Sequence, residues 1–326
     1  MPFAGPGPNA VPVVVGVVIG CGPSGSSPTG SFAGKQPRGV IGVSVLTLGN
    51  PFFKTIGDTI TAEAGKHGYD VAVVSGDNDV ARQQNQVKDF LVRKAAAIVL
   101  CPCDSKAIGP AIREANAAGV PVFTADIACL APDAKVVCHV ATDNLEGGRQ
   151  AAHAMIEALG PAGGKVVILD YKAVESCILR VQGFKEVINA HNATAAGKVT
   201  IAAELPGDGA KDKGYKAAED SLQAHPDLKG IFAINDPCAL GARAALEKAG
   251  KADAVKLIGF DGQPDGRQAI KEGKIYADPV QFPDEIGRKT VEAILQYLDG
   301  RPPPPQVLIP PTLYRTADAL ADPALT

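Results

Sequence analysis

The chain has 326 residues, of which 46% are hydrophobic and 21% charged, and its formal net charge is −3. This is the composition of a globular chain long enough for two domains of common size. The charge balance argues against a nucleic-acid partner, which would favour a basic face, and beyond the first 20 residues no apolar run approaches the length of a transmembrane helix.

The first element is an apolar run over residues 11–20, and it is followed by glycines. The sequence GCGPSG at 20–25 fits G-x-G-x-x-G, the dinucleotide-binding fingerprint. That fingerprint needs a helix after the glycines and an acidic residue about 20 residues on. Residues 26–37 contain two prolines and no helical period, and no acidic residue precedes Asp58. A nucleotide site built on these glycines is therefore disfavoured, and a reductase activity with it.

An export signal explains the same run better, because residues 11–20 have the length of a signal core. The sequence VIGC at 18–21 resembles a bacterial lipobox, which implies lipidation of Cys21. We therefore expect a signal and lipobox leader at 1–21, a flexible linker at 22–38, and a location in the periplasm or cell envelope. Residues 1–10 contain no Lys or Arg, so a disordered leader and a different start codon stay open.

From Val40 onward, continuous apolar runs alternate with stretches of helical period. Such runs predict strands buried on both faces, and the alternation predicts an α/β doubly wound fold. Strands are expected at 40–46, 70–75, 96–100, 120–125, 165–170, 199–204, 230–235 and 255–260, and the clearest helices at 81–93 and 283–298.

The predicted strands end in similar side chains. Two carboxylates, two amides and two aromatic rings follow strands or strand-like pieces: Asp126, Asp261, Asn50, Asn235, Phe52 and Phe53. Ligands of such folds bind at the carboxyl ends of strands. An enzyme with paired carboxylates would also need a nucleophile, a metal or a base, and none is evident. Carboxylates, amides and rings together suit a hydroxyl-rich ligand with an apolar face.

The cysteines and histidines are less informative. The six cysteines after Cys21 are an even set that an oxidising compartment could pair, or they are small buried hydrophobic residues: Cys101, Cys103, Cys129, Cys138, Cys177 and Cys238. No pair of histidines has metal-ligand spacing. We expect no metal and no cofactor.

At this point a family resemblance becomes clear. From Gly39 to the C-terminus the chain resembles the type I periplasmic sugar-binding proteins of ABC importers, the ribose-binding-protein family. The segments that carry the resemblance are IGVSVLTLGNPFF, ATDNLEGG, QAHPDLKGIFAINDPCALGARAALEKAG, LIGFDGQPDG and QFPDEIG.

The resemblance implies a periplasmic binding protein-like I fold, with two doubly wound parallel-sheet lobes joined by three crossover strands. It places the N-terminal lobe at 39–141 plus 282–309 and the C-terminal lobe at 142–281 plus 310–326. It further implies a monomer without enzymatic activity that closes by a hinge around a monosaccharide or polyol and delivers it to an ABC permease.

The resemblance also assigns site residues. Asn50, Phe52 and Phe53 match first-lobe contacts, Asp126 matches the carboxylate for sugar hydroxyls, and Asn235, Asp261 and Gln281 match second-lobe and hinge-side contacts. Each has an ordinary structural alternative, such as a helix start for Phe52 and Phe53 or a turn for Asp261.

Three departures from the family pattern bear on the ligand. Ile127 stands where ribose binders have an arginine, Ile178 aligns with a second-lobe arginine, and the second-lobe aromatic aligns near Gly209. Arg180 matches a different family arginine. Ribose is therefore doubtful, and a deoxy sugar, a methyl-bearing ligand or a smaller polyol fits better. Lys172 and Glu175 are candidates for replacement polar contacts.

Two other functions use the same core. A receptor subunit for chemotaxis or signalling would bind the same ligand and present it to another partner. A sugar-responsive regulator would need a basic helix-turn-helix domain in front, yet residues 1–38 contain only Lys35 and Arg38 as basic side chains. The sequence favours transport over regulation.

Overall fold

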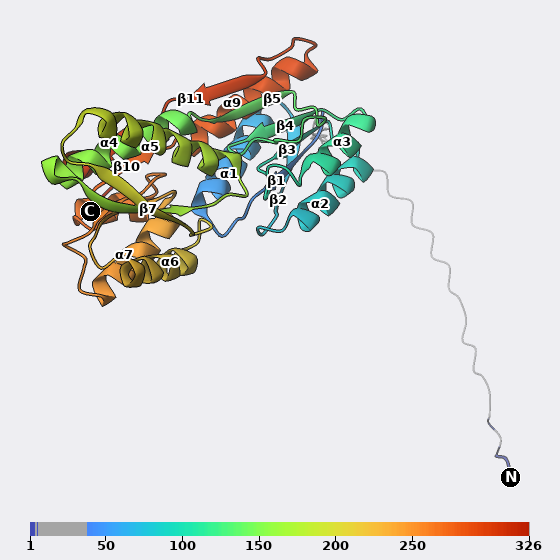
Figure 1. The fold of residues 1–326 in the computed structure, drawn as a ribbon. Coiled ribbons are helices and arrows are strands. Elements are labelled where there is room, and N and C mark those ends of the chain that lie inside the picture. The colour runs from blue at the N-terminus through green and yellow to red at the C-terminus, as the bar shows by residue number, and fades with distance from the viewer. Residues whose placement is uncertain (4, 6–37, 326) are drawn as a thin grey trace, which may run out of the picture. The chain divides into compact units, whose positions relative to one another are not determined.

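The structure is a computed structural model, and it describes residues 1–3, 5 and 38–325. Cys21 and residues 22–37 of the expected linker lie outside the described residues, as does nearly all of the expected leader. From Gly39 on, strands and helices alternate along the chain (Figure 1).

Two six-stranded sheets organise the described chain. The first sheet has the strand order β11-β5-β4-β3-β1-β2, and all of its pairs are parallel. Its strands are β1 (Gly39–Val45), β2 (Tyr69–Ser75), β3 (Ala97–Leu100), β4 (Val122–Ala125), β5 (Cys138–Thr142) and β11 (Gln306–Ile309).

The second sheet repeats this arrangement in the order β12-β10-β9-β8-β6-β7. Its pairs are parallel except for the edge strand β12, which is antiparallel to β10. Its strands are β6 (Gly164–Asp170), β7 (Val199–Pro206), β8 (Leu228–Ala233), β9 (Lys256–Ile258), β10 (Ala277–Val280) and β12 (Thr312–Arg315).

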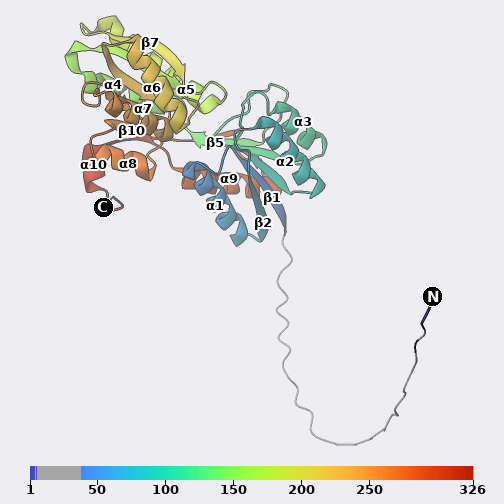
Figure 2. The same cartoon turned by 90° about the horizontal axis from the view of Figure 1, so that it is seen from below.

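The chain crosses between the two sheets three times: after β5, after β10, and between β11 and β12. Figure 2 shows the sheets in separate halves with these connections between them. The prediction of two doubly wound lobes joined by three crossovers is therefore confirmed.

Helices cover both faces of each sheet, as parallel strands require. On the first sheet, α1 (Pro51–Lys66) and α9 (Pro283–Leu298) pack on one face, and α2 (Val80–Val92) and α3 (Gly109–Ala117) on the other. On the second, α4 (Asn144–Leu159) and α5 (Glu175–Thr194) lie opposite α6 (Lys211–Ala224), α7 (Asp236–Lys248) and α8 (Pro264–Lys271). The short helices η1 (Gly160–Ala162) and α10 (Thr316–Ala321) complete the set among the described residues.

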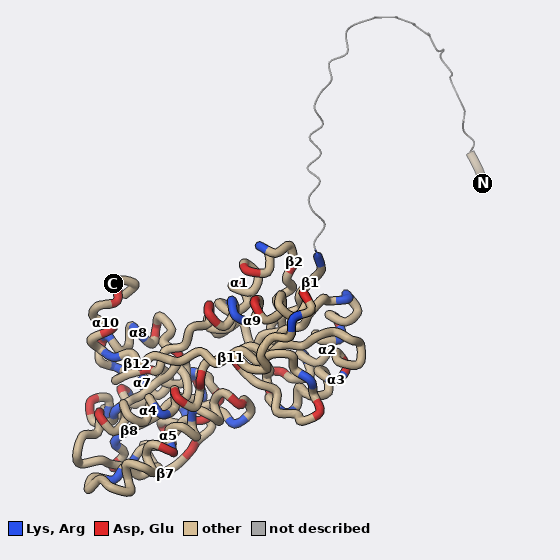
Figure 3. The backbone as a smooth tube through the Cα atoms, turned by 90° about the horizontal axis from the view of Figure 1, so that it is seen from above, with Lys and Arg blue, Asp and Glu red and all other residues tan. Residues whose placement is uncertain are grey.

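The strands form because β-branched residues fill them. Ile41, Val43 and Val45 of β1 are fully buried, as are Val166 and Val167 of β6. The apolar core around the cavity described below includes residues from both halves. Figure 3 shows Lys and Arg interleaved with Asp and Glu along both halves.

Helix α5 lies close to α4 because glycines face the contact. A Cβ atom at Gly183 would lie 2.0 Å from the carbonyl oxygen of Leu145, and one at Gly148 would lie 2.0 Å from that of Arg180. Any larger residue would force these helices apart. The two glycines therefore fix the position of α5, which carries Arg180.

The sequence pattern predicted the long buried strands within about two residues at most ends, and helix 283–298 at its observed bounds. It did not predict β5, β10, β11 or β12 as strands. These strands are short, and they lie next to the crossings, where pairing across the sheet rather than apolar content defines them.

Candidate functional site

A cavity of about 370 Å³ lies at the carboxyl ends of strands from both sheets. The expected site residues that line it are Asn50, Phe52, Phe53, Asp126, Ile127, Asn235, Asp261 and Gln281. Small-molecule sites span about 300–1,000 Å³, so this cavity is at the small end of the range. The fold thus brings together eight of the ten ligand-binding residues expected from the sequence.

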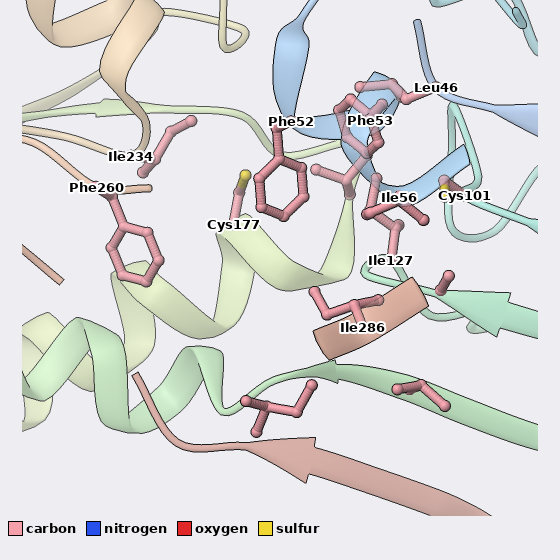
Figure 4. Packing of buried hydrophobic residues seen from close by; sticks show 14 of the residues in the cluster. Leu46, Phe52, Phe53, Ile56, Cys101, Ile127, Cys177, Ile234, Phe260 and Ile286 are labelled. Atoms are coloured by element: carbon pink, nitrogen blue, oxygen red, sulfur yellow. The ribbon is translucent and has the colours of Figure 1, made fainter. Parts of the chain in front are cut away.

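The aromatic wall comes from the start of α1. Phe52 and Phe53 are buried, with ring centroids 5.3 Å apart and planes at 87°. Asn50 caps the helix, because its Oδ1 accepts from the N–H of Phe52 at 3.0 Å. The helix start and the cavity wall are therefore the same structure. Figure 4 shows Phe52 next to Cys177 of α5 and Phe53 next to Leu46, and all four residues line the cavity.

Asp126 directly follows β4 with a left-handed backbone, at φ 64°. Its carboxyl is buried, and Oδ1 has no hydrogen-bond partner among the described residues. Burial raises the pKa of Asp126 to about 7; Arg180 opposes this shift, while Asp261 and Glu175 add to it. An unpartnered buried oxygen beside a cavity is costly unless a ligand binds to it.

Asp261 is the second carboxylate, and it also has a left-handed φ, of 106°. Three side chains donate to it: Gln281 Nε2 at 2.7 Å, Gln263 Nε2 at 3.0 Å and Arg180 Nη1 at 3.3 Å. Burial raises the pKa of Asp261, and Arg180 and these hydrogen bonds oppose the shift. Oε1 of Gln281 is buried without a partner among the described residues. Strained backbone at both carboxylates is typical of functional sites.

Arg180 is the cation of the site. Its guanidinium lies 3.9 Å from the centroid of the Phe260 ring. Nε donates to Asn144 Oδ1 at 2.8 Å, and Nη1 donates to the carbonyl of Ile234 at 2.7 Å as well as to Asp261. Guanidinium has five N–H donors. Among residues 38–325, Nη2 of Arg180 makes no hydrogen bond to the protein. Its two N–H groups are therefore available to a ligand in the cavity that Arg180 lines.

The structure corrects the sequence alignment at Ile178. This side chain is 38% exposed and lines a separate surface hollow together with Lys172 and Glu204. Residues two apart on a helix point about 200° apart, so Arg180 faces the cavity and Ile178 faces away from it. Ile178 therefore does not replace an arginine of the cavity.

Glu175 also lies outside the cavity lining, at the start of α5. Its backbone N–H donates to Ser105 Oγ at 2.9 Å, and the N–H of Ser105 donates to the carbonyl of Ala173 at 2.9 Å. Ser105 belongs to the first-sheet half, so it caps a second-sheet helix whose own N-cap, Val174, offers no side-chain acceptor. Burial raises the pKa of the Glu175 carboxyl, and the N–H of Ala128 opposes the shift. Glu175 thus joins the two halves at the cavity's edge.

Asn235 positions neighbouring backbone as well as lining the cavity. Its Oδ1 accepts from the N–H of Cys238 at 3.0 Å and so caps α7, and its Nδ2 donates to the carbonyl of Gly209 at 3.0 Å. Sequence reasoning did not select several other residues of the cavity lining, among them Tyr171, Arg180, Asp208, Gly209 and Lys211. Tyr171 directly follows the predicted strand 165–170, so the rule that ligands bind at the carboxyl ends of strands would have selected it.

The six cysteines in the described part of the chain are all free, and all except the partly exposed Cys129 are buried. This agrees with the interpretation of these residues as small buried hydrophobes. No helix in the described ranges is long and apolar enough to cross a bilayer.

The fold and the cavity define a class: a two-lobed protein that binds a small polar molecule between its lobes. Residues 41–302 match the family model described as "Periplasmic binding protein domain". The chain is 39% identical to the ribose import binding protein of Salmonella typhimurium over 269 residues, which cover 82% of this chain and 88% of that protein.

Solved structures agree with this class. An ABC transporter solute-binding protein of Agrobacterium vitis with bound D-fucose has a TM-score of 0.79 and 31% identity, covering 86% of this chain and 96% of that one. One from Mycobacterium smegmatis with bound glycerol has a TM-score of 0.79 and 30% identity, with 87% and 96% covered. The chain belongs to the type I periplasmic sugar-binding proteins, in the ribose-binding family.

Proposed function

We propose that this protein captures a monosaccharide or related polyol between its two lobes and delivers it to an ABC permease. The observation that carries the proposal is a pair of buried oxygens around one small cavity that have no partner among the described residues, Asp126 Oδ1 and Gln281 Oε1. Both can accept from a ligand, and the guanidinium of Arg180, which lines the same cavity, can donate to it. Sugar hydroxyls both donate and accept. Hydrogen bonds to charged groups contribute about 1.5–3 kcal/mol each, so a few of them suffice for micromolar binding, which needs about 8 kcal/mol.

The proposed ligand contacts are Asn50, Phe52, Phe53, Asp126, Ile127, Asn235, Asp261 and Gln281, together with Arg180. The proposed lobes are 39–141 plus 282–309 and 142–281 plus 310–326, and each contains one of the two sheets. The protein acts as a monomer without catalytic activity. Because Arg180 lies in the cavity, the argument against ribose that rested on Ile178 no longer holds, and Ile127 and Gly209 remain unlike the ribose-binding pattern.

Isothermal titration calorimetry with the ligand-free full chain tests the proposal. We expect binding in the micromolar range or tighter for at least one of D-ribose, D-allose, D-fucose, myo-inositol and glycerol. Bound ligand is first removed by unfolding in denaturant and refolding, and circular dichroism verifies the refolded state. A refolded, ligand-free protein that releases no heat with any of these compounds or with a wider sugar and polyol panel would contradict the proposal.

We further propose that Cys21 is lipidated and anchors the protein to the cell envelope. The support comes from the sequence alone, since Cys21 follows an apolar run and precedes a Ser/Gly/Pro-rich segment. Bacteria that express the chain and are fed radioactive palmitate should label it, and Cys21→Ser should abolish the label. Cys129→Ser, which removes another free thiol, serves as the control and should retain it. Equal labelling of the wild type and Cys21→Ser would exclude this anchor.

A further inference from the structure

Tyr171 is an aromatic ring on the second-sheet side of the cavity. It directly follows β6, its side chain is half-buried, and it lines the same cavity as Phe52 and Phe53. Those two rings come from α1, which packs on the first sheet. The cavity therefore has aromatic rings from both halves of the molecule.

Gly209 lies beside Tyr171 and leaves its ring uncovered on that side. The N–H groups of Gly207 and Asp208 both donate to the carbonyl of Asp170, at 2.9 and 3.0 Å, so this turn is fixed next to Tyr171. Gly209 has a φ of +65°, and a Cβ atom there would lie 3.7 Å from Tyr171 Cδ1. A side chain at position 209 would thus stand against the ring within the cavity.

The Tyr171 hydroxyl stays protonated over the physiological range. Burial raises the pKa of Tyr171 to about 12, and the nearby thiols of Cys103 and Cys177 and the carboxylate of Asp208 add to the shift. A neutral phenol keeps an apolar ring face. The charged residues of the cavity lining come from other segments than β6: Asp126, Arg180, Asp208, Lys211 and Asp261.

We propose that Tyr171 is a specificity-determining residue that packs against one face of a cyclic ligand, while Phe52 contacts the ligand from the first-sheet side. The inference rests on the proposed function and narrows its ligand class. A cyclic sugar or cyclitol presents C–H groups on its faces and hydroxyls at its rim, which suits rings on two sides and polar groups between them. An open-chain polyol has no such face, so the cavity selects cyclic ligands over open-chain polyols.

Calorimetry with the full, ligand-free chain tests this selection. The cyclic probes are D-ribose, D-allose, D-fucose and myo-inositol, and the open-chain probes are ribitol and sorbitol. We expect the best cyclic probe to bind at least tenfold more tightly than either open-chain probe. Tyr171→Ala should weaken that cyclic probe at least tenfold, whereas Tyr171→Phe, which keeps the ring, should stay within about threefold. The matched control is Tyr276→Ala, which removes a half-buried tyrosine outside the cavity and should leave the affinity unchanged.

A spectroscopic measurement separates ligand contact from a merely structural role. The chain has no tryptophan and six tyrosines, and of the described residues Tyr171 is the only tyrosine that lines the cavity. Ligand binding should therefore produce a near-ultraviolet tyrosine difference spectrum that disappears in Tyr171→Phe while calorimetry still detects binding. Gly209→Asn, which tolerates the left-handed backbone, should weaken the same probe by placing a side chain against the ring.

The outcomes are distinct. A wild type that binds none of the six probes and no compound of the wider sugar and polyol panel overturns the proposed ligand class and this inference with it. A wild type that binds while Tyr171→Ala binds equally tightly, or whose difference spectrum survives in Tyr171→Phe, overturns the inference alone. If Tyr171→Ala fails to fold, the spectrum of Tyr171→Phe decides.

Discussion

Replacing Arg180 by Met is expected to lower the free energy of unfolding by about 3–5 kcal/mol and to abolish ligand binding. The side chain of Arg180 and that of Asp261 are each only 4% exposed. Removing one partner of a buried ion pair leaves the other charge without compensation, and this costs about 3–5 kcal/mol. The change also removes the two N–H groups of Nη2 that are free for a ligand. Urea denaturation of the ligand-free protein and calorimetry measure the two effects.

Arg149→Met is the matched control, because it removes an arginine from the same lobe. Arg149 pairs with Glu186 at 2.8 Å, but its side chain is 39% exposed. Exposed ion pairs contribute little to stability because water screens both charges, so this variant should unfold at nearly the same urea concentration as the wild type and bind ligand normally. Equal losses of stability in Arg180→Met and Arg149→Met would show that burial of the Arg180 pair does not matter.

A double variant tests whether the stability loss comes from the uncompensated charge. Arg180→Met combined with Asp261→Asn removes both charges and keeps the shape of residue 261. If the loss arises from the unpaired Asp261 carboxylate, the double variant should be more stable than Arg180→Met alone, because Asp261→Asn removes that charge. The free-energy changes of two substitutions at contacting residues do not simply add. A double variant as unstable as the sum of the two single ones would instead assign the loss to the packing of Arg180 on Phe260.

The sequence predicted more of the fold than of the binding site. Continuous apolar runs such as 165–170 indicate buried parallel strands whatever their neighbours, because both faces must be covered. The strand-end rule then placed Asp126 and Asp261 at one cavity. It could not show that both have a left-handed backbone, since that conformation follows from the turns that close around them and not from residue type.

The helix position of Arg180 explains why the alignment was wrong there. Ile178 and Arg180 are only two residues apart, so a sequence match cannot decide which of them faces the ligand. The decision comes from Gly148 and Gly183, which bring α5 against α4 and so fix its rotation. Such a contact between distant segments is visible only in three dimensions.

Replacing Asp126 by Asn is expected to stabilise the ligand-free protein at pH 8 and to weaken ligand binding. A folded-state pKa raised from 3.8 to about 7 means that the carboxyl favours folding only while it is protonated. This contribution is full below pH 3.8 and is lost as the pH rises through 7. At pH 8 the loss is complete, and relative to pH below 3.8 it amounts to at most about 4 kcal/mol. Asn avoids the cost of a buried negative charge and tolerates the left-handed φ of this position.

Urea denaturation of the ligand-free protein at pH 5 and pH 8 measures this difference. The free energy of unfolding of Asp126→Asn should clearly exceed that of the wild type at pH 8 and should exceed it only slightly at pH 5. The control is Asp133→Asn, an exposed aspartate paired with Arg113, which should change stability by less than about 0.5 kcal/mol at either pH. A wild type as stable as Asp126→Asn at pH 8 would show that the carboxyl ionises in the folded protein without cost.

The same ionisation should make ligand binding depend on pH. Sugar hydroxyls that donate to Asp126 favour its ionised form, so the ligand lowers the pKa of this carboxyl and binding releases a proton. With a ligand-free pKa of about 7, the dissociation constant at pH 5.5 should be about 10- to 30-fold larger than at pH 8.5. The charged groups of Arg180, Asp261 and Glu175 lie near the same carboxyl. Asp126→Asn therefore separates the contribution of Asp126 to the pH dependence of binding from the contributions of these three residues. That variant should bind more weakly at pH 8.5 and lose most of the pH dependence, and an unchanged pH profile in it would assign the titration to another group.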